Sequence, residues 1–453
     1  MCIRDSHRYL VQHIELNALL DRRPFRRLQW LTLALCGAVA LLDGFDVQII
    51  AFAAPAISDE LGIAASRLGI VFSSGLIGMT CGLLILGPFA DRYGRKRTIE
   101  VSVLIFGLFT LLTAWVDSFN QLLALRFAAG IGLGGALPNV VALMTEFAPA
   151  RLRTLVVAAV FLGFPLGGML IGALAGVVIP SGGWQSLFLL GGGLPLLLWL
   201  LLRVWLPESP RFLAAQGPAR REELRALLRR LDTRETLDGH ITLVGTDPPD
   251  ADPARSPVGR LFDPGYGSDT LKLWMLFFIN LMVMYMLITW IPTLLVDAGH
   301  SFKQAAVASV YLNLGGALGP FLLAWVTARY GSRTTLPLFF ALAALCVALL
   351  GLAGGAPRQV LALTFLAGFF VFATQVGINS LASGIYPTAS RATGLGWALG
   401  IGRLGTVLGP LITGLMVQMN LGFPAYFGVF SGLLMIAGAT GFAIRRQQVA
   451  ATA

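Results

Sequence analysis

The chain alternates between long apolar segments and short polar links. Apolar runs occur twelve times, in two sets of six that are separated by one long polar segment. Crossing the ~30 Å hydrocarbon core of a bilayer takes about 20 apolar residues. The pattern therefore predicts an all-α polytopic membrane protein with twelve transmembrane helices in two six-helix, pseudo-symmetric bundles. The runs lie at 28–56, 68–90, 99–116, 122–145, 155–179 and 184–206, and then at 271–296, 305–328, 335–354, 360–385, 394–419 and 426–444.

The spacing of the runs predicts five parts of the chain. Residues 28–206 form the N-terminal bundle and residues 269–445 the C-terminal bundle, and residues 207–268 are a central loop between them. Residues 1–27 and 446–453 are tails. Parallel repeats of six spans place a substrate site at the interface of the halves, near the membrane midplane.

Basic residues gather in alternate links and give the expected orientation. Links rich in Lys and Arg stay in the cytoplasm, so we expect both termini and the central loop to be cytoplasmic, in a bacterial inner membrane. These basic positions are Arg22, Arg23, Arg26 and Arg27, then Arg92, Arg95, Lys96 and Arg97, then Arg151 and Arg153, Arg329 and Arg333, Arg391, and Arg445 and Arg446.

The composition agrees with a membrane protein. Of 453 residues 56% are hydrophobic and 12% are charged, whereas soluble domains are about 25% charged. The 53 glycines suit close packing of transmembrane helices. The net charge of +10 follows the topology of the links, so we expect the lipid bilayer and no nucleic acid as a partner. The four cysteines form no CxxC pair, and neither a metal site nor a disulfide framework is expected.

Two carboxylates interrupt the first apolar run. Asp43 lies near its middle and Asp46 follows three residues later, so both project from one face of a helix. A charged Asp at mid-membrane costs at least ~2.5–3.5 kcal/mol on insertion scales. Gly44 lets a backbone, a water or a ligand come close. The pair predicts a site that handles protons or ligand, and a structural ion pair is the alternative.

The link after the second run carries the pattern Gly87-x-x-x-Asp91-Arg92-x-Gly94-Arg95. Gly87 permits close helix packing and Gly94 a tight turn. We expect Asp91 to accept from the N-terminal amides of a neighbouring helix, where the dipole favours an anion. Arg92 and Arg95 are free to pair with acids at other helix ends. The cluster predicts a lock that holds cytoplasmic helix ends together, and a charge cluster that only sets topology is the alternative.

This pattern, between the second and third runs, resembles the signature of the major facilitator superfamily. Within it, residues 42–46, 386–397 and 402–405 resemble the aromatic acid:proton symporter family, in its 3-hydroxyphenylpropionate and 4-hydroxybenzoate transporter-like branch. Residues 284–295 and 163–165 are most similar to the 3-hydroxyphenylpropionate type. The resemblance covers nearly the whole chain outside the N-terminal tail and the central loop. It implies alternating access, in which the two halves rock about a central site.

Two arginines are expected to serve the carboxylates and the substrate. Arg126 opens the fourth run within reach of Asp46 and is expected to poise the carboxylates for proton transfer, with a purely structural pair as the alternative. Arg403 lies near the middle of the eleventh run, and its guanidinium fork matches a carboxylate bidentately. Pairing of Arg403 with an Asp of the first run is the alternative, and the two arrangements are free to alternate during a cycle.

Other polar residues are expected to line the cavity, with helix packing an equal alternative. They are Asn280, Tyr285, Asn313, Gln375, Asn379 and Trp397. The resemblance further implies a cytoplasmic gate in which acids face Arg95 and Arg153. The gate residues are Gly87, Asp91, Arg92, Gly94, Arg95, Glu146, Arg153, Glu208 and Arg391. In the second half Ala328 and Ser332 replace Asp91 and Arg95 of the pattern, so we expect the first half to carry most of the gating.

These features predict a secondary transporter that imports an aromatic monocarboxylate, of the hydroxybenzoate or hydroxyphenylpropionate type, with protons. We expect a monomer that uses the proton gradient and needs no cofactor. No Gly-rich loop ending in Lys and Ser or Thr is found, which argues against an ATP-driven pump. A proton-coupled exporter of drugs or organic acids is the alternative, because residues 163–168 resemble the span-five motif of drug antiporters. An intramembrane enzyme would need a paired catalytic set, yet all four histidines lie outside the apolar runs.

Overall fold

The fold is helical throughout its membrane part. The structure, a computed structural model, describes residues 14–15, 25–231, 241–242, 258–263, 266–353, 356–386 and 388–444. Within these ranges twelve helices are long and apolar enough to cross a membrane, which confirms the twelve-span prediction. The first six are α2 (Arg27–Leu61), α3 (Leu68–Tyr93), α4 (Arg95–Leu112), α5 (Phe119–Phe147), α6 (Ala150–Gly182) and α7 (Gln185–Trp205). The second six are α10 (Gly267–Asp297), α11 (Phe302–Tyr330), α12 (Ser332–Leu352), α13 (Pro357–Ile385), α14 (Thr388–Gln418) and α15 (Phe423–Phe442).

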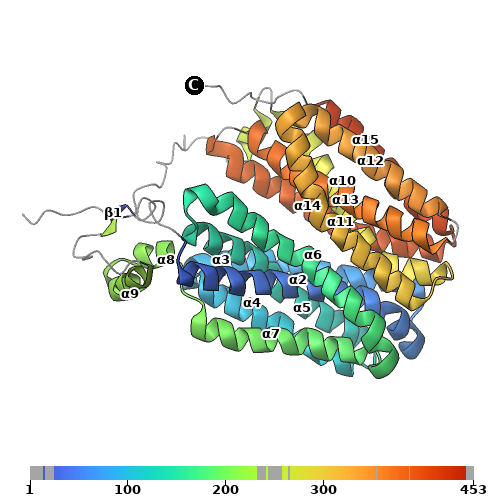
Figure 1. Ribbon diagram of the computed structural model, residues 1–453, viewed down its shortest axis with the longest axis horizontal. Helices are drawn as coiled ribbons and strands as arrows, with labels where there is room; N and C mark the ends of the chain where they lie inside the picture. The colour runs from blue at the N-terminus through green and yellow to red at the C-terminus, as the bar shows by residue number, and fades with distance from the viewer. Residues whose placement is uncertain are drawn as a thin grey trace, which may run out of the picture.

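The helices form two bundles that lie side by side, α2–α7 in blue to green and α10–α15 in yellow to red (Figure 1). Two short helices, α8 (Pro210–Ala215) and α9 (Arg221–Leu231), follow α7 and lie beyond one end of the first bundle. We call this end, where α2 and α10 begin, the α8 end, and the opposite end, where α2 and α10 finish, the far end.

The polar parts of the chain contribute little regular structure. The side chain of Ser209 caps α8 by accepting from the Phe212 amide, and α9 buries its leucines behind a basic outer face. A two-residue strand, β1 (Ile14–Glu15), pairs in parallel with β2 (Ile241–Thr242). The described residues leave out most of the N-terminal tail, much of the central loop and residues 445–453. The orientation expected from Arg22, Arg23, Arg445 and Arg446 therefore concerns residues outside the described ranges.

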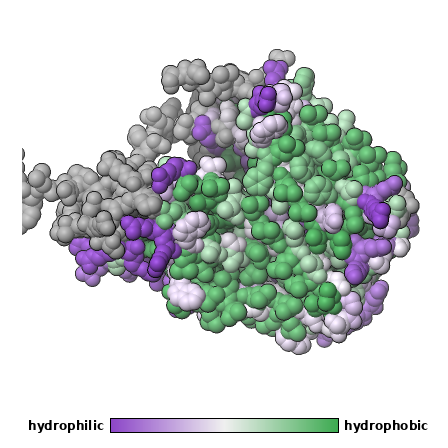
Figure 2. Space-filling model, in the orientation of Figure 1, coloured by the Kyte–Doolittle hydropathy of each residue, from purple (hydrophilic) through white to green (hydrophobic). Residues whose placement is uncertain are grey.

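The outer surface of the bundles is that of a multi-pass membrane protein. Apolar residues cover most of the visible face, and polar patches lie toward its two ends (Figure 2). Large apolar side chains such as Leu84, Val204 and Leu352 are about 70% exposed on the helix flanks. In water such a surface would be an aggregation hazard, whereas in a bilayer it meets lipid.

Glycines allow a close contact between two helices of the first bundle. A Cβ atom at Gly44 of α2 would overlap the backbone of Phe164 in α6, and one at Gly167 of α6 would overlap the backbone of α2 at Leu41. The two backbones therefore touch beside Asp43 and Asp46. The close approach that Gly44 allows is filled by a helix backbone.

The two bundles touch in the far half of their helices. Among the described residues, Ser73 of α3 donates to the Val407 carbonyl of α14, at 2.8 Å. The rings of Phe72 and Trp290, on α3 and α10, meet edge to face at 5.4 Å. Gly69 of α3 leaves room for the backbone of Pro410 in α14. These contacts close the interface toward the far end.

Candidate functional site

Asp46 belongs to a fully formed polar cluster inside the first bundle. Nη2 of Arg126, on α5, lies 3.2 Å and 3.4 Å from the two carboxylate oxygens of Asp46. The Thr110 hydroxyl, on α4, donates to Asp46 Oδ1 and accepts from Arg126 Nη2 at 3.0 Å. The ring of Phe188, on α7, faces the guanidinium at 5.6 Å. Asp46 and Arg126 are 1% and 4% exposed, so this is a buried, well-bonded ion pair.

Asp43 has the opposite environment, although it shares a helix face with Asp46. Its side chain is completely buried, and neither carboxylate oxygen has a hydrogen-bond partner among the described residues. The charges close enough to act on it are those of Asp46 and Arg403. A carboxylate that accepts no hydrogen bond is costly to bury in its ionised form.

Arg403 is the cation on the other side of this site. It lies on α14, partly exposed, with Nη1 3.7 Å from the Met79 sulfur of α3. The Tyr285 hydroxyl of α10 is within hydrogen-bonding range of the same guanidinium. Neither contact neutralises the charge, so the guanidinium remains available to an anion. The structure thus brings Asp43, Arg403 and Tyr285 together from both bundles.

A small cavity adjoins the ion pair. It lies between Asp46, Arg126 and Met79 of the first bundle and Thr289 of α10, with a volume of about 30 Å³. That volume suits a water molecule rather than an aromatic acid. In this conformation the space beside Asp46 is therefore collapsed.

The other residues predicted to line the cavity fall into three groups. Asn280 donates to Gln375 at 2.9 Å and accepts from Thr374 at 2.7 Å, all within the second bundle. This network favours the helix-packing alternative for that pair. Asn379 is exposed, and Trp397 is 45% exposed and stacks on Trp274 at 6.0 Å, toward the α8 end.

Asn313 forms the third group, with a residue that the sequence did not single out. Its amide and that of Gln48 exchange two hydrogen bonds between α11 and α2, at 2.8 Å and 3.1 Å. The signal was present in the sequence, since Gln48 is an amide two residues after Asp46 in an otherwise apolar run.

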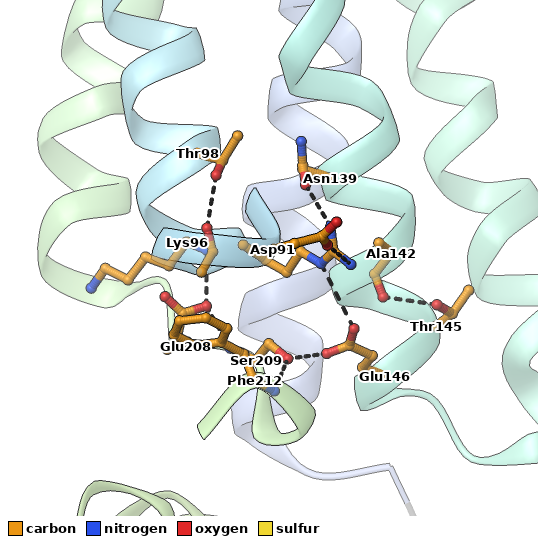
Figure 3. A network of polar contacts seen from close by, with 12 residues as sticks. Asp91, Lys96, Thr98, Asn139, Ala142, Thr145, Glu146, Glu208, Ser209 and Phe212 are labelled. Carbon is orange, nitrogen blue, oxygen red and sulfur yellow. Dashed lines mark hydrogen bonds and ion pairs between the residues drawn. The ribbon is translucent and has the colours of Figure 1, made fainter. Parts of the chain in front are cut away.

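The predicted gate residues gather at the α8 end (Figure 3). Arg95 pairs with Asp91 at 3.2 Å, lies 4.0 Å from Glu146 and donates to Asn139 at 3.2 Å. The Ser209 hydroxyl donates to Glu146. These contacts join α3, α4 and α5 to the start of α8, all within the first half of the chain.

Glu208 caps α4 in this network. Its Oε1 accepts from the amides of Lys96, at 3.0 Å, and Ser209, at 2.8 Å. Gly94 has φ +99°, and a side chain there would overlap the Glu208 carboxylate. Burial raises the pKa of Glu208 above its usual range, against the opposing effect of the backbone amides. The anion expected at a helix N-terminus is therefore present, but Glu208 supplies it.

Several expectations for the gate need correction. Asp91 is 73% exposed and binds Arg95 instead of helix amides. A Cβ at Gly87 would meet nothing within 4 Å, so this glycine makes no close helix contact here. Arg92 lies over the Tyr93 ring at 5.4 Å. Nε of Arg153 has no hydrogen-bond partner among the described residues, and Arg391 is exposed.

The second half has a smaller polar cluster at the same end, which the sequence did not reveal. Lys272 of α10 lies 3.3 Å from Asp269. The Tyr386 hydroxyl is 3.1 Å from the Thr270 hydroxyl, which donates to the Leu261 carbonyl. No cluster of three or more His, Cys, Asp or Glu side chains that could hold a metal occurs in the described ranges.

Comparison with known proteins gives consistent matches along the whole chain. The family model of the Major Facilitator Superfamily matches residues 36–357 and 273–451. The chain is 38% identical to the gallate transporter of Pseudomonas putida, over 91% of each protein. It is 39% identical to the 4-hydroxybenzoate transporter PcaK of Pseudomonas putida, over 87% of this chain and 88% of that one.

More distant matches agree. The 3-(3-hydroxy-phenyl)propionate transporter of Escherichia coli is 34% identical, over 92% of this chain and 95% of that protein. Among solved structures, the inward open conformation of the xylose transporter XylE from E. coli superposes with a TM-score of 0.73 at 18% identity, covering 94% of this chain and 98% of that one. At that identity the likeness concerns the fold alone.

Proposed function

The chain belongs to the Major Facilitator Superfamily and is a membrane transporter rather than an enzyme, and from this premise we propose that it imports an aromatic monocarboxylate together with protons. The relatives named above carry hydroxylated aromatic acids in their names, which supports that substrate class. We further propose that it works as a monomer in a bacterial inner membrane, with the proton gradient as driving force and no cofactor.

The environment of Asp43 is the observation that carries the proposal. Asp46 is held by Arg126 and Thr110, so its charge is compensated in place. Asp43 has no hydrogen-bond donor among the described residues, so its ionised form is costly to bury in this conformation. We therefore assign proton carriage to Asp43 and the positioning of Arg126 to Asp46.

Coupling then follows from the shared neighbour, Arg403. While Asp43 is ionised, its negative charge attracts the Arg403 guanidinium and competes with any other anion. When Asp43 takes up a proton this attraction ends, and Arg403 binds the substrate carboxylate through its bidentate fork. The loaded site then has no net charge in the low-dielectric centre of the membrane, which lowers the free-energy cost of the conformational change.

We place the α8 end in the cytoplasm, because the links rich in Lys and Arg lie there. The far end then faces outward, and the contacts between the bundles close it. On this assignment the described conformation is closed to the outside. Breaking the contacts in the far half would open the site to the outside.

The test is uptake into proteoliposomes made with the purified protein. With acid outside and neutral buffer inside, labelled 4-hydroxybenzoate should accumulate above the level in protein-free liposomes, and a proton uncoupler should abolish the excess. Absence of protein-dependent uptake, together with extrusion of a drug under the same gradient, would support the exporter instead.

A further inference from the structure

A pair of buried amides crosses the boundary between the bundles. Gln48 Nε2 donates to Asn313 Oδ1 at 3.1 Å, and Asn313 Nδ2 donates to Gln48 Oε1 at 2.8 Å. The side chains are 1% and 0% exposed. Asn313 also donates to the Ser309 carbonyl of its own helix, at 2.9 Å. Each amide is therefore satisfied only while the two bundles touch.

The pair of amides lies farther from the α8 end than Asp43 does. Gln48 is five residues beyond Asp43 on α2, which corresponds to a rise of ~7.5 Å toward the far end. Gly168 of α6 lies against both amides, and a side chain there would overlap them. Gly168 thus provides the space that the two amides occupy.

Opening the far end must separate these two amides. A buried amide that loses its partner is costly, so water or a polar group of the substrate must replace the broken bonds in the outward-open state. A hydroxyl group can donate one hydrogen bond while it accepts another. It can therefore donate to the carbonyl of one amide and accept from the NH₂ of the other.

We propose that Gln48 and Asn313 bind a ring hydroxyl of the substrate when the far end is open, and so make the transporter select hydroxylated over unsubstituted aromatic acids. This rests on the proposed function, with the substrate carboxylate on Arg403. An acid without the hydroxyl leaves both amides unpaired, and sites built to bind a hydroxyl discriminate strongly against analogues that lack it. When the bundles close again, the amides return to each other and release the hydroxyl.

The experiment compares 4-hydroxybenzoate with benzoate, since the two differ by that one group. Initial uptake by proteoliposomes with acid outside is measured for each acid and corrected with protein-free liposomes, because benzoic acid crosses bilayers unaided. The test protein carries Gln48→Met and Asn313→Leu together, because replacing both partners by apolar side chains of similar shape leaves no orphaned amide.

Ser73→Ala is the matched control. Ser73 also forms a buried hydrogen bond across the bundle boundary in the far half, to Val407, but it is not one of the paired amides. Loss of its bond alters the closing of the far end without altering hydroxyl recognition. A role in gating alone would change uptake of both acids in the same proportion in both variants.

The wild type should prefer 4-hydroxybenzoate in kcat/KM, and the double variant should lower that preference about tenfold while retaining benzoate uptake, which corresponds to the loss of about one hydrogen bond. Ser73→Ala should leave the preference unchanged.

Three results would overturn the inference and leave the proposed function standing: a wild type without preference, an unchanged preference in the double variant, or an equal loss of preference in Ser73→Ala. Failure of the wild type to take up either acid would instead refute the proposed function, and the inference with it. If the double variant does not reconstitute, the thermal shift of the detergent-purified proteins by each acid gives the same comparison as a binding preference.

Discussion

At the scale of single residues, two carboxylates of the same helix face have different surroundings. Asp46 is bound by a guanidinium and a hydroxyl, whereas Asp43, one turn earlier, has no donor within the described part of the chain. The difference arises from the neighbouring helices, since α4 and α5 reach Asp46 with Thr110 and Arg126. The proposed division, with structural support at Asp46 and proton exchange at Asp43, rests on this difference in surroundings.

Removing only one charge of the buried Asp46–Arg126 pair should destabilise the protein more than removing both charges. Arg126→Met leaves a buried carboxylate without its cation, so we expect a loss of ~3–5 kcal/mol in the free energy of unfolding. The double variant Asp46→Leu with Arg126→Met removes both charges and should recover most of that loss. Thermal unfolding in detergent measures both, and equal destabilisation by the single and the double variant would contradict a compensated pair.

Arg403 should bind the substrate through the geometry of its fork as well as its charge. Arg403→Lys retains the charge but offers no planar pair of donors, so the dissociation constant for 4-hydroxybenzoate should rise about tenfold, or ~1.4 kcal/mol. Isothermal titration of the purified protein measures the change, with the exposed Arg358→Lys as a control for loss of a surface guanidinium. An unchanged affinity in Arg403→Lys would place the carboxylate elsewhere.

The sequence predicted single residues well where a charge stood in an apolar run. Asp43, Asp46, Arg126 and Arg403 stand out because an intramembrane charge needs a reason. Partners that depend on packing were not predictable. Which acid caps α4 depends on how the chain turns after α7, and this turn brings Glu208 to the amides in place of Asp91.

At the scale of elements, the contact between α2 and α6 positions the site. The two backbones meet at Gly44 and Gly167, so the carboxylates on either side of Gly44 are held on a helix that has no room to shift toward α6. The sequence indicated that Gly44 allows a close approach. That the approaching group is the backbone of Phe164 followed only from the assembled bundle.

Two glycines of α2 provide a matched comparison. Gly44→Ala would press a methyl group into the backbone of α6 and should destabilise the protein by ~1–3 kcal/mol. Gly37 lies in the same helix, and a Cβ there meets nothing within 4 Å. Gly37→Ala should be neutral or stabilise by up to ~1 kcal/mol, because alanine favours the helix. Thermal unfolding decides, and equal effects of the two substitutions would contradict the packing described here.

The limits of the helices were predictable to within a few residues because apolar runs and basic links alternate so regularly. The seventh run was expected from residue 271, and α10 begins at Gly267. The packing of the polar faces was less predictable. Asn280 and Gln375 are separated by almost a hundred residues and satisfy each other across α10 and α13, a match that no local pattern encodes.

At the scale of the whole molecule, the two bundles meet through uncharged polar and aromatic contacts. Hydrogen bonds and ring contacts join them in the far half. At the α8 end the described ion pairs join helices within one half of the chain. Such an arrangement suits two halves that rock as units, with Asp43 and Arg403 at the level where the contacts between them begin.

The central claim is that Asp43 couples the proton to the substrate, and Asp43→Asn tests it most directly. In proteoliposomes with acid outside, this variant should lose concentrative uptake of labelled 4-hydroxybenzoate. It should still exchange label across the membrane when unlabelled substrate is loaded inside and no gradient is imposed, because a neutral side chain at this position mimics the protonated acid. Concentrative uptake by Asp43→Asn equal to that of the wild type would contradict the account.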